Sequence, residues 1–121
     1  MRRRAAWTGG PPPAGLLRVQ DPEIDLGPHR VQQDGVPINL TPLEFRLLAC
    51  LAGHSGRVLT HAMIWQAVWG SESADEGHML RVNISRLRRK IERDPARPAI
   101  ILTVPGVGYM VPAEAWRPWQ G

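Results

Sequence analysis

The residues best suited to chemistry in this chain are the arginines between Leu80 and Arg93, and that chemistry is the binding of a polyanion. The segment reads LRVNISRLRRKIER, and its only acidic residue is Glu92. Basic helix faces normally interleave acids that support them, whereas here the positive charges repel one another unless a partner neutralises them. The charge pattern therefore indicates a nucleic-acid partner, with a solvated surface as the alternative.

Apolar residues within the same segment predict a helix that buries one side. Leu80, Ile84, Leu87 and Ile91 recur at steps of four, three and four, which places them in one stripe at about 100° per residue. An α-helix with such a stripe can sit in a core and still enter the major groove of DNA with its other side. The opposite face and its two flanks carry the following residues: Val82, Ser85, Arg86, Arg89 and Arg93, then Arg81 and Arg88, then Asn83 and Lys90.

The chain before this segment divides into a linker and a sheet. Residues 1–15 combine an arginine cluster with Gly9-Gly10 and three prolines, which is typical of a flexible linker or tail. Residues 16–40 alternate in short runs, and the Asp34-Gly35 pair between two runs predicts a tight hairpin. We expect three or four antiparallel strands, with Pro37 placing the last one near an edge.

Two further helices are predicted by their N-terminal caps. Thr41-Pro42-Leu43-Glu44 has the residues of a capping box, and the following run is apolar almost all round, so it should be buried as far as Gly53. Cys50 in this run is expected to be a core thiol. Thr60 should cap the second helix, which ends near Gly70.

The remaining segments are an acidic loop, a hairpin and a tail. Residues 71–77 read SESADEG, and phosphates would repel such a loop. Residues 99–112 contain two β-rich runs about a Gly turn, and no helix follows Gly106-x-Gly108 to make it a nucleotide loop. Residues 113–121 are expected to be a C-terminal tail, and the pattern gives no role for Trp116 or Trp119.

Composition excludes several classes of protein. The net charge is +4, and a single cysteine excludes an intrachain disulfide framework. No apolar run approaches the ~18 residues of a membrane span, and no secretory signal is present, so we expect a cytoplasmic protein without a membrane partner. The chain lacks paired His/Cys metal spacing, GxSxG and a phosphate loop, so no enzyme activity, metal or cofactor is expected.

The order of sheet, three helices and hairpin predicts an α+β fold, the winged helix-turn-helix, over residues 16–112. Four motifs in this order resemble the C-terminal DNA-binding domain of OmpR/PhoB-type response regulators: LTPLEFRLL, VWG, LRVNISRLRRKIE and GVGY. Within that family, PLEFRLLA and RDPARP look most similar to the regulator of potassium-transport genes.

The resemblance implies the effector domain of a bacterial two-component regulator in a phosphorelay. In that family a phosphorylated receiver domain drives dimerisation, and the effector domains bind tandem half-sites on double-stranded DNA and contact RNA polymerase. The segment before the sheet is too short to be a receiver, so we expect an excised domain or an orphan, monomeric in the absence of DNA.

Site residues follow partly from the exposed helix face and partly from the resemblance. Arg86 is expected to contact guanine through two hydrogen bonds, and Val82 to pack on a thymine methyl. The base-contacting set is Val82, Asn83, Ser85 and Arg86. The phosphate-contacting set is His78, Arg81, Arg88, Arg89, Thr103 and Tyr109. The loop expected to touch polymerase contributes Glu72, Ser73, Asp75 and Glu76.

Two departures from the family pattern concern the wing. Pro105 and Met110 stand where the family commonly has basic residues, so we expect the helix to dominate affinity and the wing to contribute shape. The rival hypothesis is a winged-helix module whose basic face docks an acidic protein partner. Such a module would bind random duplex poorly, with no steep dependence on salt.

Overall fold

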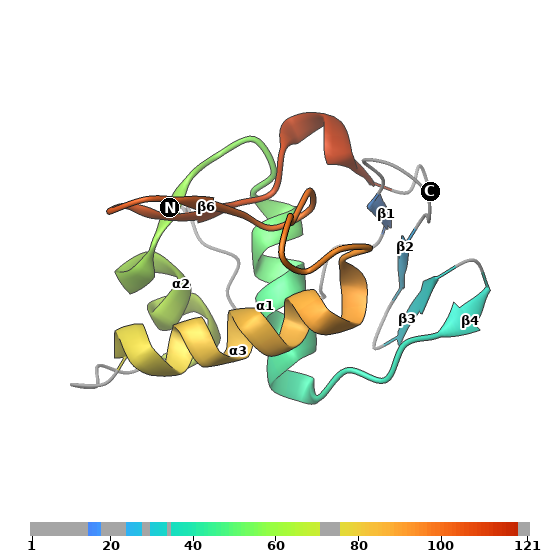
Figure 1. Cartoon of the computed structure of the whole chain (residues 1–121), viewed down its shortest axis with the longest axis horizontal. Coiled ribbons are helices and arrows are strands. Elements are labelled where there is room, and N and C mark those ends of the chain that lie inside the picture. Colours follow the sequence, from blue (N-terminus) through green and yellow to red (C-terminus); the bar gives the residue numbers. More distant parts are fainter. Residues whose placement is uncertain (1–14, 18–23, 28–29, 34, 71–75, 119–121) are drawn as a thin grey trace, which may run out of the picture.

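The computed structural model describes residues 15–17, 24–27, 30–33, 35–70 and 76–118 (Figure 1). The elements in chain order are β1 (Gly15–Leu17), β2 (Ile24–Gly27), β3 (Arg30–Gln33), β4 (Val36–Pro37), α1 (Pro42–Gly53), β5 (Leu59–Thr60), α2 (His61–Val68), α3 (Glu76–Ile91), β6 (Leu102–Val104), β7 (Gly108–Met110), η1 (Ala113–Ala115) and β8 (Trp116–Pro118). Of the two antiparallel sheets, the one that contains β1 to β4 lies at the right end of the molecule, and the one that contains β6 lies above the second helix at the left (Figure 1). Among the described residues, no helix is long and apolar enough to cross a membrane.

The first sheet has five strands in the order β4-β3-β2-β1-β8. The predicted hairpin is present, with Gly35 at a φ of 81° in the β3–β4 connection, and Pro37 lies in the edge strand as expected. The expectation of a C-terminal tail from residue 113 is wrong for residues 113–118. Trp116 pairs with Leu17 along β1, and Ala115 is buried, so this segment completes the sheet.

Helix α1 is the centre of the core, as its apolar sequence predicted. Its capping box is formed: the Thr41 hydroxyl accepts from the Glu44 N–H at 3.1 Å, and Glu44 Oε1 accepts from the Thr41 N–H at 3.0 Å. Leu47 and Leu48 have no exposed surface. Cys50 is a buried free thiol, and burial raises its pKa to about 11. It is therefore a core residue rather than a nucleophile.

Acid should weaken the fold through Glu44, a buried carboxylate that also accepts from Lys90 Nζ at 2.6 Å. Burial opposes ionisation, but the hydrogen bonds from Lys90 and Thr41 hold the pKa of Glu44 below 4.5. Because the pKa of Glu44 is lower in the folded protein than in the unfolded chain, its carboxylate contributes its full stabilisation above about pH 4.5. This stabilisation is lost as the pH falls through the pKa of Glu44 in the folded protein. Urea unfolding between about pH 6 and about pH 3 should show a smaller acid-induced loss for Glu44→Gln. Parallel curves for the two proteins would contradict this assignment.

The second sheet, in the order β5-β7-β6, contains the wing, here defined as the hairpin Leu102–Met110. Gly106 has a φ of 76° in the turn of this hairpin. A Cβ on Gly108 would lie 1.8 Å from the main-chain oxygen of Leu59, so only glycine allows β7 to approach β5. The two glycines thus serve the hairpin, in agreement with the prediction that they form no nucleotide loop.

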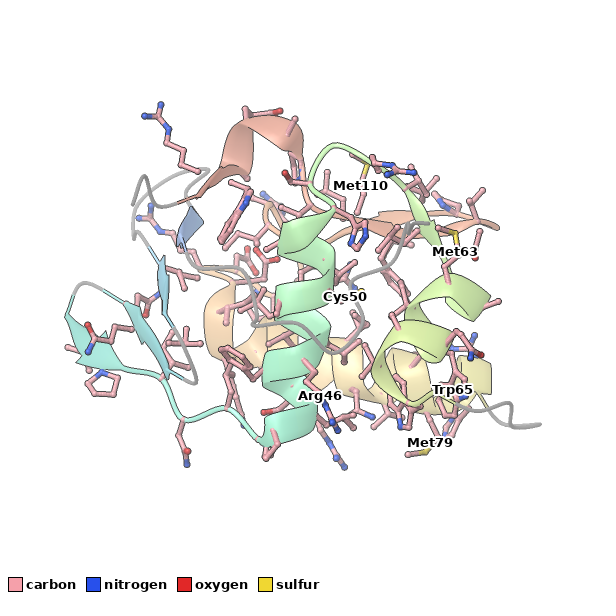
Figure 2. The ribbon with its side chains drawn as sticks, turned by 180° about the vertical axis from the view of Figure 1, so that it is seen from behind. Arg46, Cys50, Met63, Trp65, Met79 and Met110 are labelled. Carbon is pink, nitrogen blue, oxygen red and sulfur yellow. The ribbon has the colours of Figure 1, made fainter. Side chains whose placement is uncertain are left out.

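Helix α2 carries the predicted cap and packs through its aromatic residues. The Thr60 hydroxyl accepts from the Met63 N–H at 3.1 Å. Trp65 and Trp69 stack with ring centroids 4.1 Å apart. Figure 2 shows Trp65 on the side of α2 near the start of α3, close to the labelled Met79. The cap and the stacked rings stabilise α2, the helix that precedes α3 in a helix-turn-helix.

Candidate nucleic-acid interface

Helix α3 presents the predicted basic face to solvent. Leu80, Ile84, Leu87 and Ile91 are at most 1% exposed, so the apolar stripe lies wholly in the core. The side turned away from them is here called the outer face of α3. The helix itself runs below α2 and the wing in Figure 1. Its exposed residues are His78, Arg81, Ser85, Arg86 and Arg89, and Val82 beside them is half-buried. Arg93, also exposed, follows the end of the helix.

Glu92, the only acid of this segment, does not neutralise the basic face. It is 8% exposed, and its two carboxylate oxygens accept from main-chain N–H groups beyond the helix. The distances are 2.9 Å from Ala99, 3.1 Å from Ile100 and 2.8 Å from Ile101. Within the described part of the chain, Arg81, Arg86 and Arg89 form no ion pair, so their charges remain available to a polyanion.

Arg88 is turned from the outer face toward the wing. Its Nε and Nη2 donate to the main-chain oxygen of Ile101 at 3.2 and 2.7 Å, and Nη2 also donates to the Thr103 hydroxyl at 2.8 Å. The guanidinium carbon lies 5.6 Å from the centre of the Tyr109 ring. Arg88, Thr103 and Tyr109, all predicted as phosphate contacts, therefore form one cluster where α3 meets the wing.

Tyr109 is a packing residue in this cluster, which the sequence did not indicate. Its side chain is in the core at 5% exposure, because the ring packs against Arg88 and stacks on His61 at 5.5 Å between centroids. The phosphate contact of Tyr109 that the resemblance implies stays an expectation, and the packing role of its ring is additional to it. Thr103, by contrast, is exposed on β6.

Asn83 lies on the flank of α3, as expected, but its side chain is buried, which does not favour the base contact that was expected of it. The residue is 5% exposed, and its Nδ2 donates to the main-chain oxygen of Met79 at 2.9 Å. Asn83 follows Leu80 by three positions and precedes Leu87 by four, so helical geometry brings it to the border of the apolar stripe. A short amide can be buried there because it bonds the preceding turn of the helix.

Four residues of the acidic loop were expected to touch polymerase, and the structure describes only one of them. Glu72, Ser73 and Asp75 lie outside the described residues, and Glu76 is described only as the first residue of α3. Among the described residues, no three His, Cys, Asp or Glu side chains come together as a metal site would require. The expected site residues that the structure describes lie on α3 and on the wing, and His61 at the start of α2 stacks on Tyr109 beside them.

The sequence did not reveal that Glu92 and His61 support this surface from beneath it. His61 begins α2, and its half-buried ring supports Tyr109 from a position 48 residues earlier in the chain, so no local pattern reveals the pair. Glu92 carried one signal that was not used: a single acid among many arginines at the end of a helix. Such an acid has a structural partner elsewhere when it does not pair with its neighbours.

Comparison with known proteins places residues 35–111 in one family. They match the family model described as "Transcriptional regulatory protein, C terminal". The DNA-binding response regulator MtrA of Mycolicibacterium paratuberculosis is 43% identical over 97 residues, which are 80% of this chain and 43% of MtrA. The KDP operon transcriptional regulatory protein KdpE of Escherichia coli K12 is 38% identical over 109 residues, which are 90% of this chain and 47% of KdpE. The chain thus spans less than half the length of these relatives.

The fold is also found in solved structures. The response regulator DrrB of Thermotoga maritima, described as an OmpR/PhoB homologue, superposes with a TM-score of 0.68 and 35% sequence identity. The match covers 81% of this chain and 44% of the DrrB chain. The predicted α+β winged helix-turn-helix fold is therefore confirmed.

Proposed function

Because the chain belongs to the family of OmpR/PhoB-type transcriptional regulatory C-terminal domains, which bind DNA, we propose that it recognises a specific duplex sequence with α3 in the major groove. The observation that carries the proposal is the outer face of α3, where Arg81, Arg86 and Arg89 are exposed and form no ion pair in the described structure. Three such cations on one helix face suit a regular polyanion whose major groove admits a helix.

Side-chain chemistry divides this face into two groups. Arg86 has the planar fork that matches two acceptors of guanine, and Val82 and Ser85 beside it can meet a thymine methyl and a base edge. His78, Arg81 and Arg89 lie on the same helix and suit phosphate oxygens, which fix the register of the protein without reading sequence. Thr103, whose hydroxyl accepts from Arg88, leaves the proposed phosphate-contacting set. Asn83 leaves the proposed base-contacting set because it is buried.

The wider setting of the domain is also a proposal. Since the relatives are response regulators more than twice as long as their match, we propose that the chain acts with a receiver domain in the cytoplasm. Dimerisation through the receiver would place two domains on tandem half-sites. The segment between α2 and α3 would then meet RNA polymerase.

Selection of duplexes from a random pool, followed by salt titration of the best one, tests the proposal. We expect one sequence motif, and a fall in log affinity with log salt of about 0.9 for each phosphate neutralised. Arg89→Ala should reduce this slope by about 0.9, the value for one lost phosphate contact. An interaction module for an acidic protein would instead enrich no motif and bind random duplex weakly even at low salt. Either of those results would overturn the proposed function.

A further inference from the structure

The main chain that leads into the wing is held by two side chains four residues apart, Arg88 in the last turn of α3 and Glu92 just after the helix ends. Glu92 accepts from the N–H of Ile101 at 2.8 Å, and Arg88 donates to the carbonyl oxygen of the same residue at 2.7 Å. Both polar main-chain groups of Ile101 are thus bonded to the C-terminal end of α3 or the residue that follows it. Ile101 immediately precedes β6, so the start of the wing is tied to the helix that is proposed to read DNA.

Each end of this connection is reinforced. On one side, Glu92 also accepts from the N–H groups of Ala99 and Ile100. On the other side, Arg88 also donates to the hydroxyl of Thr103, the second residue of β6, at 2.8 Å. The Arg88 side chain also lies over the Tyr109 ring of β7. A displacement of the wing from α3 would therefore break several charge-assisted hydrogen bonds at once.

We propose that Arg88 and Glu92 are positioning residues of the DNA-binding surface, which hold the wing at one fixed orientation to α3. Arg88 then acts on DNA affinity through the wing rather than as a phosphate contact. This inference rests on the proposed function, and it changes the role that the resemblance gave to Arg88.

The charge of the wing makes the two roles of Arg88 distinguishable. The hairpin from residue 102 to residue 110 reads LTVPGVGYM and contains no charged side chain. Loss of its contacts to DNA would weaken binding without altering the number of neutralised phosphates. Loss of a phosphate contact by Arg88 would instead lower the salt dependence by about one unit.

The decisive variant is Arg88→Lys, which keeps the positive charge but lacks the two-nitrogen fork that holds Ile101. We expect Arg88→Lys and Arg88→Gln to bind the selected duplex about tenfold more weakly, the size of one or two neutral hydrogen bonds, with the salt slope of the unmodified chain. Arg89→Gln, a matched change on the outer face, should lower the slope. Near-normal binding by Arg88→Lys together with a reduced slope for Arg88→Gln would overturn the proposal.

A double-mutant cycle keeps the test independent of damage to the fold. Thr103→Val removes one acceptor of Arg88 from an exposed strand position, where the risk to folding is small. If Thr103 acts through Arg88, this change should weaken binding in the unmodified chain and have no further effect beside Arg88→Gln. Fully additive losses would contradict the coupling.

Residual dipolar couplings of the wing amides, measured without DNA, separate this inference from the proposed function. The couplings should report a reorientation of the wing relative to α3 in Arg88→Lys and none in Arg89→Gln. This reorientation is expected even if the chain bound no DNA, in which case the proposed function alone would fail. Unchanged couplings in Arg88→Lys would refute the positioning role.

Discussion

Replacement of Glu92 by glutamine is expected to lower the free energy of unfolding by about 2–4 kcal/mol. The carboxylate is buried and accepts hydrogen bonds from three consecutive main-chain N–H groups, those of Ala99, Ile100 and Ile101. Glutamine keeps one acceptor oxygen but places an NH₂ group against the remaining donors. At least one N–H would then be buried without a partner, in a domain whose total stability is expected to be about 5–15 kcal/mol.

Urea unfolding followed by far-UV circular dichroism measures this effect, with Glu114→Gln as the matched control. Glu114 is exposed on η1, so the same chemical change there should alter the free energy of unfolding by less than about 0.5 kcal/mol. If Glu92→Gln were as stable as the control, the carboxylate would not be the anchor of the segment between α3 and β6.

Replacement of Arg86 by alanine is expected to cost about 1–3 kcal/mol of binding free energy on the selected duplex and little on a scrambled one. The guanidinium is exposed on the outer face of α3 and has no ion pair in the described structure, so it is free to bond a base edge. Arg86→Lys should lose most of the same discrimination, because an ammonium lacks the two parallel donors that match guanine.

Arg46→Ala is the matched control for the loss of charge. Arg46 is exposed on α1, and Figure 2 shows it on the helix that lies in front of α3 in that view. Its removal changes the net charge as Arg86→Ala does, without touching the outer face of α3. Fluorescence anisotropy with both duplexes should show discrimination lost for Arg86→Ala and kept for Arg46→Ala. Equal losses on both duplexes for Arg86→Ala would argue against base reading.

Local patterns in the sequence predicted the elements that depend on neighbouring residues. The cap at Thr41, the buried stripe through Leu87 and the edge position of Pro37 each follow from spacing within one turn or one strand, and all three are confirmed. The basic outer face of α3 was predictable for the same reason. These features require no knowledge of distant parts of the chain.

Contacts between distant segments explain what the sequence did not reveal. Trp116 joins β1 across almost the whole length of the chain, and nothing in the short run after Pro112 distinguishes that strand from a tail. Arg88 and Asn83 both lie at the border between the buried and exposed sides of α3. There, helical periodicity does not decide whether a side chain is exposed. Arg88 is turned by a partner outside the helix, the main-chain oxygen of Ile101, whereas Asn83 is buried with a bond to the preceding turn of its own helix.

An NMR titration of the arginine Nε–H resonances with the selected duplex shows whether the outer face of α3 meets duplex DNA. We expect large shifts for Arg81, Arg86 and Arg89 and none for Arg46. Shifts at Arg46 without shifts at Arg81, Arg86 and Arg89 would contradict DNA binding by the outer face of α3.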